Sequence, residues 1–218
     1  MPHVVLLGDS IFDNAAYVGN GHSVIEKLRR HLPPDWQATL LAIDGDVTEE
    51  VHAQTKKLPL DASHLIISCG GNDALGQLGL LQEPITSIIA ALNRLAGVLD
   101  AFRSEYRTML DHVKTLNKNV LVCTIYDSIP QFDSGMLKGL ALFNDVILSE
   151  AIRAGLPIID LRLICTERSD YSGISPIEPS ETGGEKIARV IAGLLTPHGF
   201  ATARSGIYGA LKSATNDS

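Results

Sequence analysis

Short apolar runs alternate with longer amphipathic segments along most of the chain. Each run is rich in Val, Ile and Leu and is bounded by Gly, Asp or Asn, which is typical of strands buried on both faces of a sheet. We therefore predict five strands, over Val4–Leu7, Ala38–Ile43, His64–Ser68, Val120–Ile125 and Pro157–Leu161.

Most segments between these runs carry apolar residues at spacings of three and four, the period of a helix with one buried face. They predict helices over Ser23–Leu32, Thr48–Leu58, Ile85–Leu116, Gly139–Ala154 and Glu181–Leu195. Five strands that are each followed by a helix predict an α/β fold, a three-layer α/β/α sandwich around a parallel sheet. We expect residues 1–203 to form a single domain and the small, polar residues 204–218 to form a frayed or loosely docked tail.

Composition narrows the class of protein. The chain has 218 residues, of which 45% are hydrophobic, enough for one sizeable core. Its net charge of −7 argues against a nucleic-acid partner, because phosphate binding needs clustered Lys and Arg. The three cysteines lie far apart and form neither a disulfide framework nor a metal motif, which fits a reducing compartment. With no signal peptide and no apolar run long enough to span a bilayer, we expect a cytoplasmic protein without a membrane partner. These features do not predict the oligomeric state.

Ligand sites of parallel sheets collect at the carboxyl ends of the strands, so the residues there matter most. Gly8-Asp9-Ser10 follows the first predicted strand directly. A serine at a strand-to-helix turn exposes its hydroxyl as a nucleophile does, although it is equally typical of a helix cap. The tripeptide by itself leaves both interpretations open.

Two further loops at the same edge offer hydrogen-bond donors. Gly45 follows the second predicted strand, and Gly70-Gly71-Asn72-Asp73 follows the third. Each loop taken alone is also typical of an ordinary turn. Together they place an attacking oxygen of Ser10, a glycine N–H and the Asn72 amide around one point, which is the arrangement that acyl transfer requires.

These blocks resemble the SGNH-hydrolase (GDSL-like) superfamily from Val4 to Leu195. The resemblance implies a flavodoxin-like sandwich with a five-stranded parallel sheet and Ser10 as the nucleophile. It implies an oxyanion hole made by the N–H groups of Ser10 and Gly45 and by the Asn72 side chain. It also implies substrates among carboxylic esters and thioesters, acylated sugars and lysophospholipids. We expect no cofactor and no metal.

The fifth block departs from the family, which has Asp-x-x-His just before the last helix. Here Ser175-Pro176-Ile177-Glu178 stands at that place, followed by Pro179, so both the Asp and the His are absent. Glu178 acts as a base only if burial raises its pKa, whereas a nearby helix N-terminus lowers it. Three interpretations stay open: a general base, a polar acceptor for substrate or structure, and a surface acid.

Other polar residues near this edge are candidates for substrate binding. His22 lies at the start of the helix after Ser10, where it serves either as an alternative base or as a capping or solvent-facing residue. Arg168 lies in the fifth loop and suits an anionic or polar substrate, or simply a solvated loop. Asp9 and Asp73 are expected to brace the loops beside the substrate. The segment 74–84 is expected to form either a lid or an acyl-contacting wall, or to pack ordinarily.

Two function classes follow from these patterns. The first is a hydrolase that acts on a small polar ester, with Ser10 as the nucleophile and an altered base at Glu178. The second is a binding protein that keeps the oxyanion pocket but has lost proton transfer. The chain has no glycine-rich phosphate loop of the required spacing, which argues against a third class, a nucleotide-binding module.

Overall fold

The computed structural model describes residues 1–195 and 205–210, which form one parallel sheet with helices on both faces. The sheet has six strands in the order β2-β1-β3-β4-β5-β6, and every pairing is parallel. The strands are β1 His3–Gly8, β2 Gln37–Leu40, β3 His64–Ser68, β4 Asn119–Cys123, β5 Ile158–Ile159 and β6 Ile207–Tyr208. The predicted α/β sandwich is therefore confirmed, with six strands where the sequence predicted five.

Five of the α-helices occupy the predicted segments with shifted ends, whereas the short helix α3 was not predicted. The α-helices are α1 Val24–His31, α2 Val51–Thr55, α3 Gly71–Leu75, α4 Ile88–Thr115, α5 Ser134–Ala154 and α6 Glu181–Leu195. Short 3-10 turns are η1 Ala15–Tyr17, η2 Thr48–Glu50, η3 Leu78–Gln82, η4 Leu161–Leu163 and η5 Arg168–Asp170. The largest shift is at α5, which begins five residues earlier than the predicted Gly139, because the Asp133 side chain accepts a hydrogen bond from the Met136 N–H and caps the helix.

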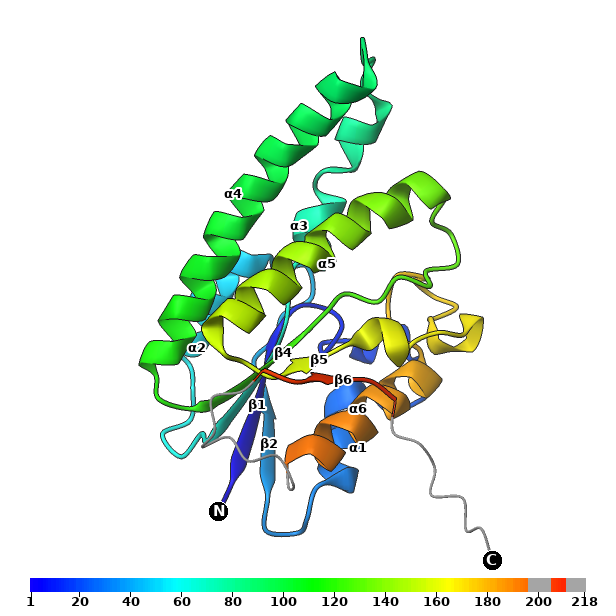
Figure 1. Ribbon diagram of the computed structural model, residues 1–218. Coiled ribbons are helices and arrows are strands. Elements are labelled where there is room, and N and C mark those ends of the chain that lie inside the picture. The colour runs from blue at the N-terminus through cyan, green and yellow to red at the C-terminus, as the bar shows by residue number, and fades with distance from the viewer. Residues whose placement is uncertain (196–204, 211–218) are drawn as a thin grey trace, which may run out of the picture.

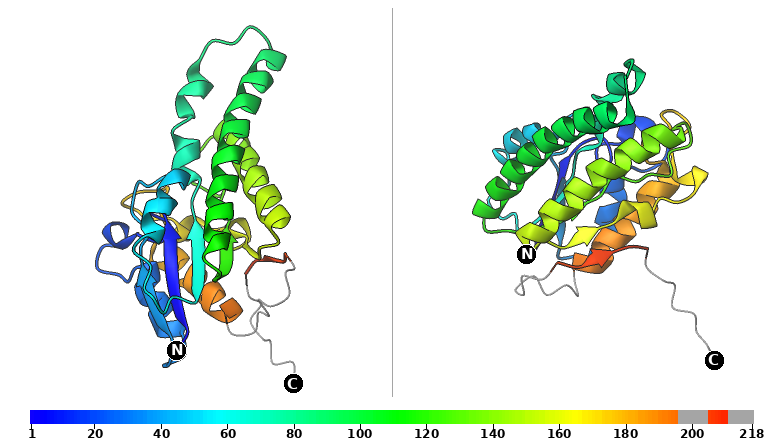
Figure 2. Two further views of the ribbon diagram at one scale, coloured as in Figure 1. Left: turned by 90° about the vertical axis from the view of Figure 1, so that its left-hand side faces the viewer. Right: turned by 45° about the horizontal axis from the view of Figure 1, so that its top comes forward.

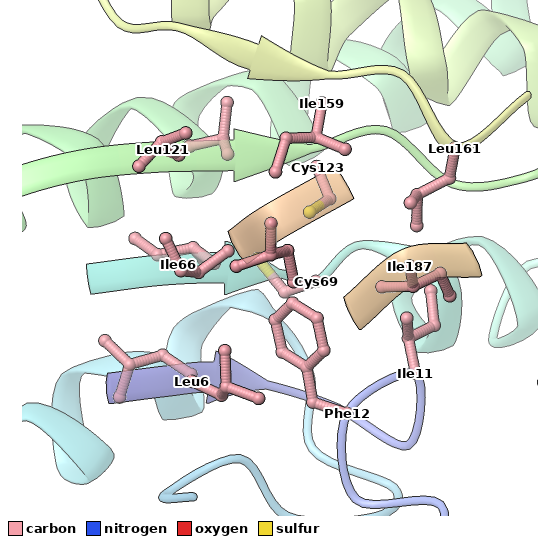
Figure 3. Packing of buried hydrophobic residues seen from close by; sticks show 14 of the residues in the cluster. Leu6, Ile11, Phe12, Ile66, Cys69, Leu121, Cys123, Ile159, Leu161 and Ile187 are labelled. Carbon is pink, nitrogen blue, oxygen red and sulfur yellow. The ribbon is translucent and has the colours of Figure 1, made fainter. Parts of the chain in front are cut away.

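Helices cover the sheet on both sides (Figure 1). Helices α1 and α6 pack together on one face, whereas α4 packs against α2 and α5 on the other. Figure 3 shows part of the core, with Leu6, Ile66 and Leu121 on three neighbouring strands and Ile187 contributed by α6. These side chains are fully buried, as expected of strands covered on both faces.

The sixth strand lies within the segment predicted to be a polar tail. Ile207 and Tyr208 form β6, which pairs with β5 at the edge of the sheet. The Ile158 N–H donates to the Gly206 carbonyl over 2.8 Å, and the Asp160 N–H donates to the Tyr208 carbonyl over 2.7 Å. The predicted domain end at residue 203 and most of the predicted tail lie outside the described residues.

Helix α4 extends beyond the body of the protein. Its second half is packed, with Phe102, Tyr106 and Val113 buried. Its first turns project past the sheet, together with η3, on the side of the carboxyl ends of the strands (Figure 2). Ile88 and Leu92 there are 82% and 54% exposed, although the apolar spacing continues through them. The pattern predicted the helix correctly, but it does not show how far the sheet reaches.

The structure also describes the cysteines and the lengths of the helices. Cys69, Cys123 and Cys165 are buried free thiols. Over residues 1–195 and 205–210, none of the helices has both the length and the apolar character needed to cross a bilayer.

Candidate active site

The turn after β1 positions the candidate nucleophile. Gly8 has φ +119°, and a Cβ on it would lie 1.7 Å from the Ser68 carbonyl oxygen, so only glycine fits this close approach. The next N–H, that of Asp9, donates to the same carbonyl over 3.0 Å. Ile11 and Phe12 then anchor the chain in the core (Figure 3). Ser10 is thereby held at the carboxyl edge of the sheet between two fixed points.

Ser10 opens onto a pocket at the carboxyl edge of the sheet, whose space, open to solvent, is about 550 Å³. Three other predicted site residues, Asp9, Asn72 and Glu178, line the same pocket. Most of the remaining wall is apolar and comprises Ile11, Ala74, Leu75, Leu78, Ile125, Ile129, Phe132, Met136, Leu140 and Ile177, with Gly71 and Tyr126. The segment 74–84 therefore supplies part of the pocket wall.

Glu178 is a buried acid, which excludes its interpretation as a surface residue. Its exposed fraction is 5%, and burial raises its pKa from 4.5 to about 7. Hydrogen bonding with the Ser10 hydroxyl opposes this rise, and the negative charge of Asp44 adds to it. Among the described residues, the Glu178 Oε2 atom has no hydrogen-bond partner. Of the influences on this carboxyl, desolvation is the largest, so the shift runs in the direction that a general base needs.

The backbone around Glu178 is tied down on both sides. The Glu178 N–H donates to the Ser175 carbonyl over 3.0 Å, and its own carbonyl accepts from the Ser172 N–H over 2.8 Å. The Tyr126 hydroxyl donates to the Ile177 carbonyl over 2.5 Å. Helix α6 is capped separately, by the Ser180 hydroxyl accepting from the Gly183 N–H. Glu178 therefore does not cap the helix, and its carboxylate is held toward Ser10.

Asp9 is a second buried carboxyl in the same pocket. It is 2% exposed, and its Oδ1 atom accepts from the Ile11 N–H over 3.1 Å. Burial raises its pKa to about 8, with further increases from the charges of Glu178 and Asp73. At neutral pH Asp9 is therefore largely protonated, whereas Glu178 is close to half ionised. Two neighbouring carboxyls with different affinities for a proton are typical of acid–base sites.

The predicted oxyanion donors differ in whether their N–H groups are already hydrogen-bonded. Within the described residues, the N–H groups of Ser10 and Gly45 donate to no other residue. One N–H of the Asn72 amide donates to the Asp46 carbonyl over 2.9 Å, which leaves its second N–H. Gly45 has φ +88° in an exposed loop and does not line the pocket, so its contribution to an oxyanion hole stays a prediction.

The remaining candidates lie outside the pocket. Asp73 braces a loop, because its Oδ2 atom accepts from the N–H and the hydroxyl of Thr48 over 3.1 and 3.0 Å. His22 contacts the guanidinium of Arg30 over 2.7 Å at the start of α1. Arg168 is exposed at the beginning of η5. A substrate-binding role for these three residues stays a prediction.

Sequence reasoning missed the side of the pocket that follows β4. Tyr126 belongs to the loop after this strand, and Ile129, Phe132, Met136 and Leu140 continue along the loop and the first turns of α5. Their signal in the sequence is a set of apolar residues around the Asp133-Ser134 helix start.

Across residues 1–195 and 205–210, no group of three or more His, Cys, Asp or Glu side chains is arranged to hold a metal ion.

Comparison with known proteins places these features in a family. The GDSL-like Lipase/Acylhydrolase family matches residues 6–185, which is most of the chain. The chain belongs to this family. A search of curated proteins finds no match.

Solved structures of esterases and lipases share the fold at low sequence identity. The lipase Lip_vut3 from a goat rumen metagenome has a TM-score of 0.68 at 18% identity, covering 91% of this chain and 99% of its own. An acetyl xylan esterase, AlAXEase, has a TM-score of 0.63 at 16% identity, covering 85% and 96%. The lipase/acylhydrolase from Enterococcus faecalis has a TM-score of 0.62 at 21% identity, covering 89% and 95%. Membership of the GDSL-like family supports ester hydrolysis in general.

Proposed function

We propose that the protein is a carboxylic-ester hydrolase in which Ser10 attacks the acyl carbon and Glu178 is the general base. The observation that carries this proposal is the buried Glu178 carboxyl beside Ser10, with its pKa raised to about 7. Unperturbed histidine has a pKa of about 6.5, so Glu178 matches the basicity of the residue it replaces. A base whose pKa lies near the working pH is the most effective one.

The first half of the reaction forms an acyl-enzyme. The Glu178 carboxylate accepts the Ser10 hydroxyl proton while Oγ bonds to the ester carbon and the carbonyl oxygen becomes an oxyanion. The tetrahedral intermediate then collapses, the carbon–oxygen bond to the alcohol breaks, and the Glu178 carboxylic acid gives its proton to the departing alkoxide. Water repeats these steps on the acyl-enzyme and regenerates Ser10.

The charge balance of this site differs from that of a histidine site. When neutral histidine takes the proton, a cation and an oxyanion form together. When Glu178 takes it, the existing negative charge moves from the carboxylate to the carbonyl oxygen. The N–H groups of Ser10 and Gly45 and the second amide N–H of Asn72 are the donors proposed to receive that charge. Because Asp9 is largely protonated at neutral pH, it adds little negative charge beside the reacting atoms.

The pocket lining supports a substrate with an apolar acyl group. Ten of the lining residues are Ala, Ile, Leu, Phe or Met, and they extend from Ser10 to α5. Burying an acyl chain against them gains about 0.8 kcal/mol for each methylene group. The proposal therefore departs from the small polar ester expected from the sequence, an expectation that stays untested.

A covalent probe and ester substrates test the proposal together. The protein is incubated with a fluorophosphonate and, separately, with nitrophenyl acetate, butyrate and octanoate, alongside Ser10→Ala. We expect a covalent adduct at Ser10, turnover of the esters, and loss of both in Ser10→Ala. The alternative of a binding protein without turnover is favoured if no adduct and no hydrolysis appear between pH 5 and 10.

A further inference from the structure

Gln54 on α2 is fully enclosed, with an exposed fraction of 1%, and lies outside the pocket. Its side-chain amide makes three hydrogen bonds. Its Oε1 atom accepts from the Gly8 N–H over 2.8 Å, and its Nε2 atom donates to the Gly8 carbonyl over 2.7 Å. The same Nε2 atom donates to the Asp46 carboxylate over 2.8 Å. A buried amide with all three bonds made is a fixed point in the structure.

The Gln54 amide supports the end of strand β1. Strand β2 pairs with β1 as far as Leu40 opposite Leu6, and just beyond it the Ile43 N–H donates to the Gly8 carbonyl over 3.1 Å. The Gly8 N–H is bonded by the Gln54 side chain instead, and Gln54 also donates to the same carbonyl. A primary amide presents the same acceptor and donor as a peptide group, and Gln54 offers both to Gly8. The ladder is thus extended to the residue that stands two positions before Ser10.

The network continues from Gln54 to the other predicted donors. Asp46, whose carboxylate Gln54 holds, directly follows Gly45 in the chain. The Asp46 carbonyl in turn accepts from the Asn72 amide over 2.9 Å. One side chain thereby connects the loop of Ser10, the loop of Gly45 and, through Asp46, the amide of Asn72.

We infer that Gln54 is a positioning residue that fixes the three donors of the oxyanion hole relative to one another. This inference rests on the proposed ester hydrolysis and extends it to a residue outside the pocket. Donors in an oxyanion hole act on the transition state and must be held in place before charge develops. Loosening them lowers kcat and leaves substrate binding in the apolar pocket nearly unchanged.

The test compares Gln54→Met with a matched change on the same helix. Met keeps the length of the side chain and removes its donor and acceptors. The control is Thr55→Val, a buried neighbour whose hydroxyl contacts the His52 carbonyl and His112 and no loop of the pocket. We expect Gln54→Met to lower kcat about 10- to 100-fold, with KM within about threefold, and Thr55→Val to keep kcat within about twofold.

A double variant separates positioning from a general loss of stability. In an Asn72→Ala background, the hydrogen bond from the Asn72 amide to the Asp46 carbonyl is absent, so the Gln54 network no longer reaches this donor. The effect of Gln54→Met on kcat is therefore expected to be smaller there than in the unaltered protein. Equal effects in both backgrounds would overturn the link from Gln54 to Asn72.

A second readout decides the inference even if the protein turns over no ester. Amide exchange measured by nuclear magnetic resonance reports the Gly8 N–H, and the side-chain amide signals of Asn72 report its surroundings. We expect Gln54→Met to speed exchange at Gly8 and to shift the Asn72 signals, whereas Thr55→Val changes neither. Absence of Ser10 labelling in the unaltered protein would defeat the proposed function alone. Unchanged Gly8 exchange, unchanged Asn72 signals and, where turnover exists, unchanged kcat in Gln54→Met would overturn the inference.

Discussion

The two sides of the pocket hold their polar groups in opposite ways. On the donor side, Gln54, Asp46 and Asn72 form a connected set of hydrogen bonds that ties three loops together. On the base side, the Glu178 backbone is fixed, but its Oε2 atom has no partner among the described residues, and burial raises its pKa. In the proposed mechanism, the donor side holds its N–H groups in place, whereas the base side keeps a carboxylate away from water.

If the proposed mechanism holds, this contrast shows how the fold can work without the family's histidine. In that mechanism the side of the site that receives charge depends on geometry, and the residues that resemble the family's donors are present. In the proposed mechanism the side that moves the proton depends on pKa, and desolvation raises the pKa of Glu178 toward that of an imidazole. The predictions below disturb one side at a time.

The largest effect is expected from Glu178→Gln. Gln keeps the size of the side chain and cannot accept the Ser10 proton at neutral pH, so kcat is expected to fall about 10²- to 10⁴-fold. Steady-state hydrolysis of a nitrophenyl ester measures the change. Glu181→Gln is the matched control, because Glu181 is exposed three residues later and pairs with Lys27. Comparable losses in both variants would show that charge near α6, and not the base, determines the rate.

Removing a donor is expected to have the next largest effect. Asn72→Ala deletes the amide and should lower kcat about 10²- to 10³-fold, as loss of one oxyanion donor does elsewhere. The rate of Ser10 labelling by a fluorophosphonate should fall with it, since labelling also passes through a charged phosphoryl oxygen. An unchanged kcat would remove Asn72 from the donor side.

Stability distinguishes the two sides by its dependence on pH. Glu178 has a pKa of about 7 when folded and about 4.5 when unfolded, so the folded protein holds this proton more tightly. Its contribution to stability is fully present below pH 4.5 and is lost as pH rises through 7. Between pH 5 and pH 8 the unaltered protein should therefore lose about 2–3 kcal/mol of unfolding free energy through Glu178, and Glu178→Gln should not lose it. Urea unfolding at both pH values measures it, and Asn72→Ala should show no such dependence.

The smallest effect is expected at the apolar wall of the pocket, which lies between the two sides and contacts the acyl chain in the proposed mechanism. Leu78→Trp should fill part of the pocket and lower the ratio of kcat/KM for octanoate over acetate about tenfold. Leu92→Trp, on the exposed part of α4, should leave this ratio unchanged. An equal loss for both esters in Leu78→Trp would indicate that the acyl chain binds elsewhere.

The fold and half of the site could be predicted because they depend on local patterns. Buried apolar runs predicted β1 to β5, and glycine-bounded loops predicted Ser10 and Asn72 at one edge of the sheet. The strand β6 was missed because two residues in a polar tail carry no periodic signal, and they pair only because β5 offers an open edge.

The pKa of Glu178 could not be predicted because it depends on burial by distant segments. The helix dipole and desolvation shift this pKa in opposite directions, and their relative sizes depend on burial that the sequence does not show. Tyr126 and Ile177, which close the pocket around Glu178, come together through contacts across 51 residues of chain. Gln54 was equally hidden, since a glutamine in a short polar helix gives no sign that it will reach Gly8.

The dependence of kcat/KM on pH tests the central claim most directly, because it reports the pKa of the base in the free enzyme. With Glu178 as the desolvated base, kcat/KM should rise with pH around an apparent pKa of about 7. In Glu178→Gln, the residual rate should lose this rise. A rise centred near 4.5, or one near 7 that persists unchanged in Glu178→Gln, would contradict the assignment of Glu178 as the base.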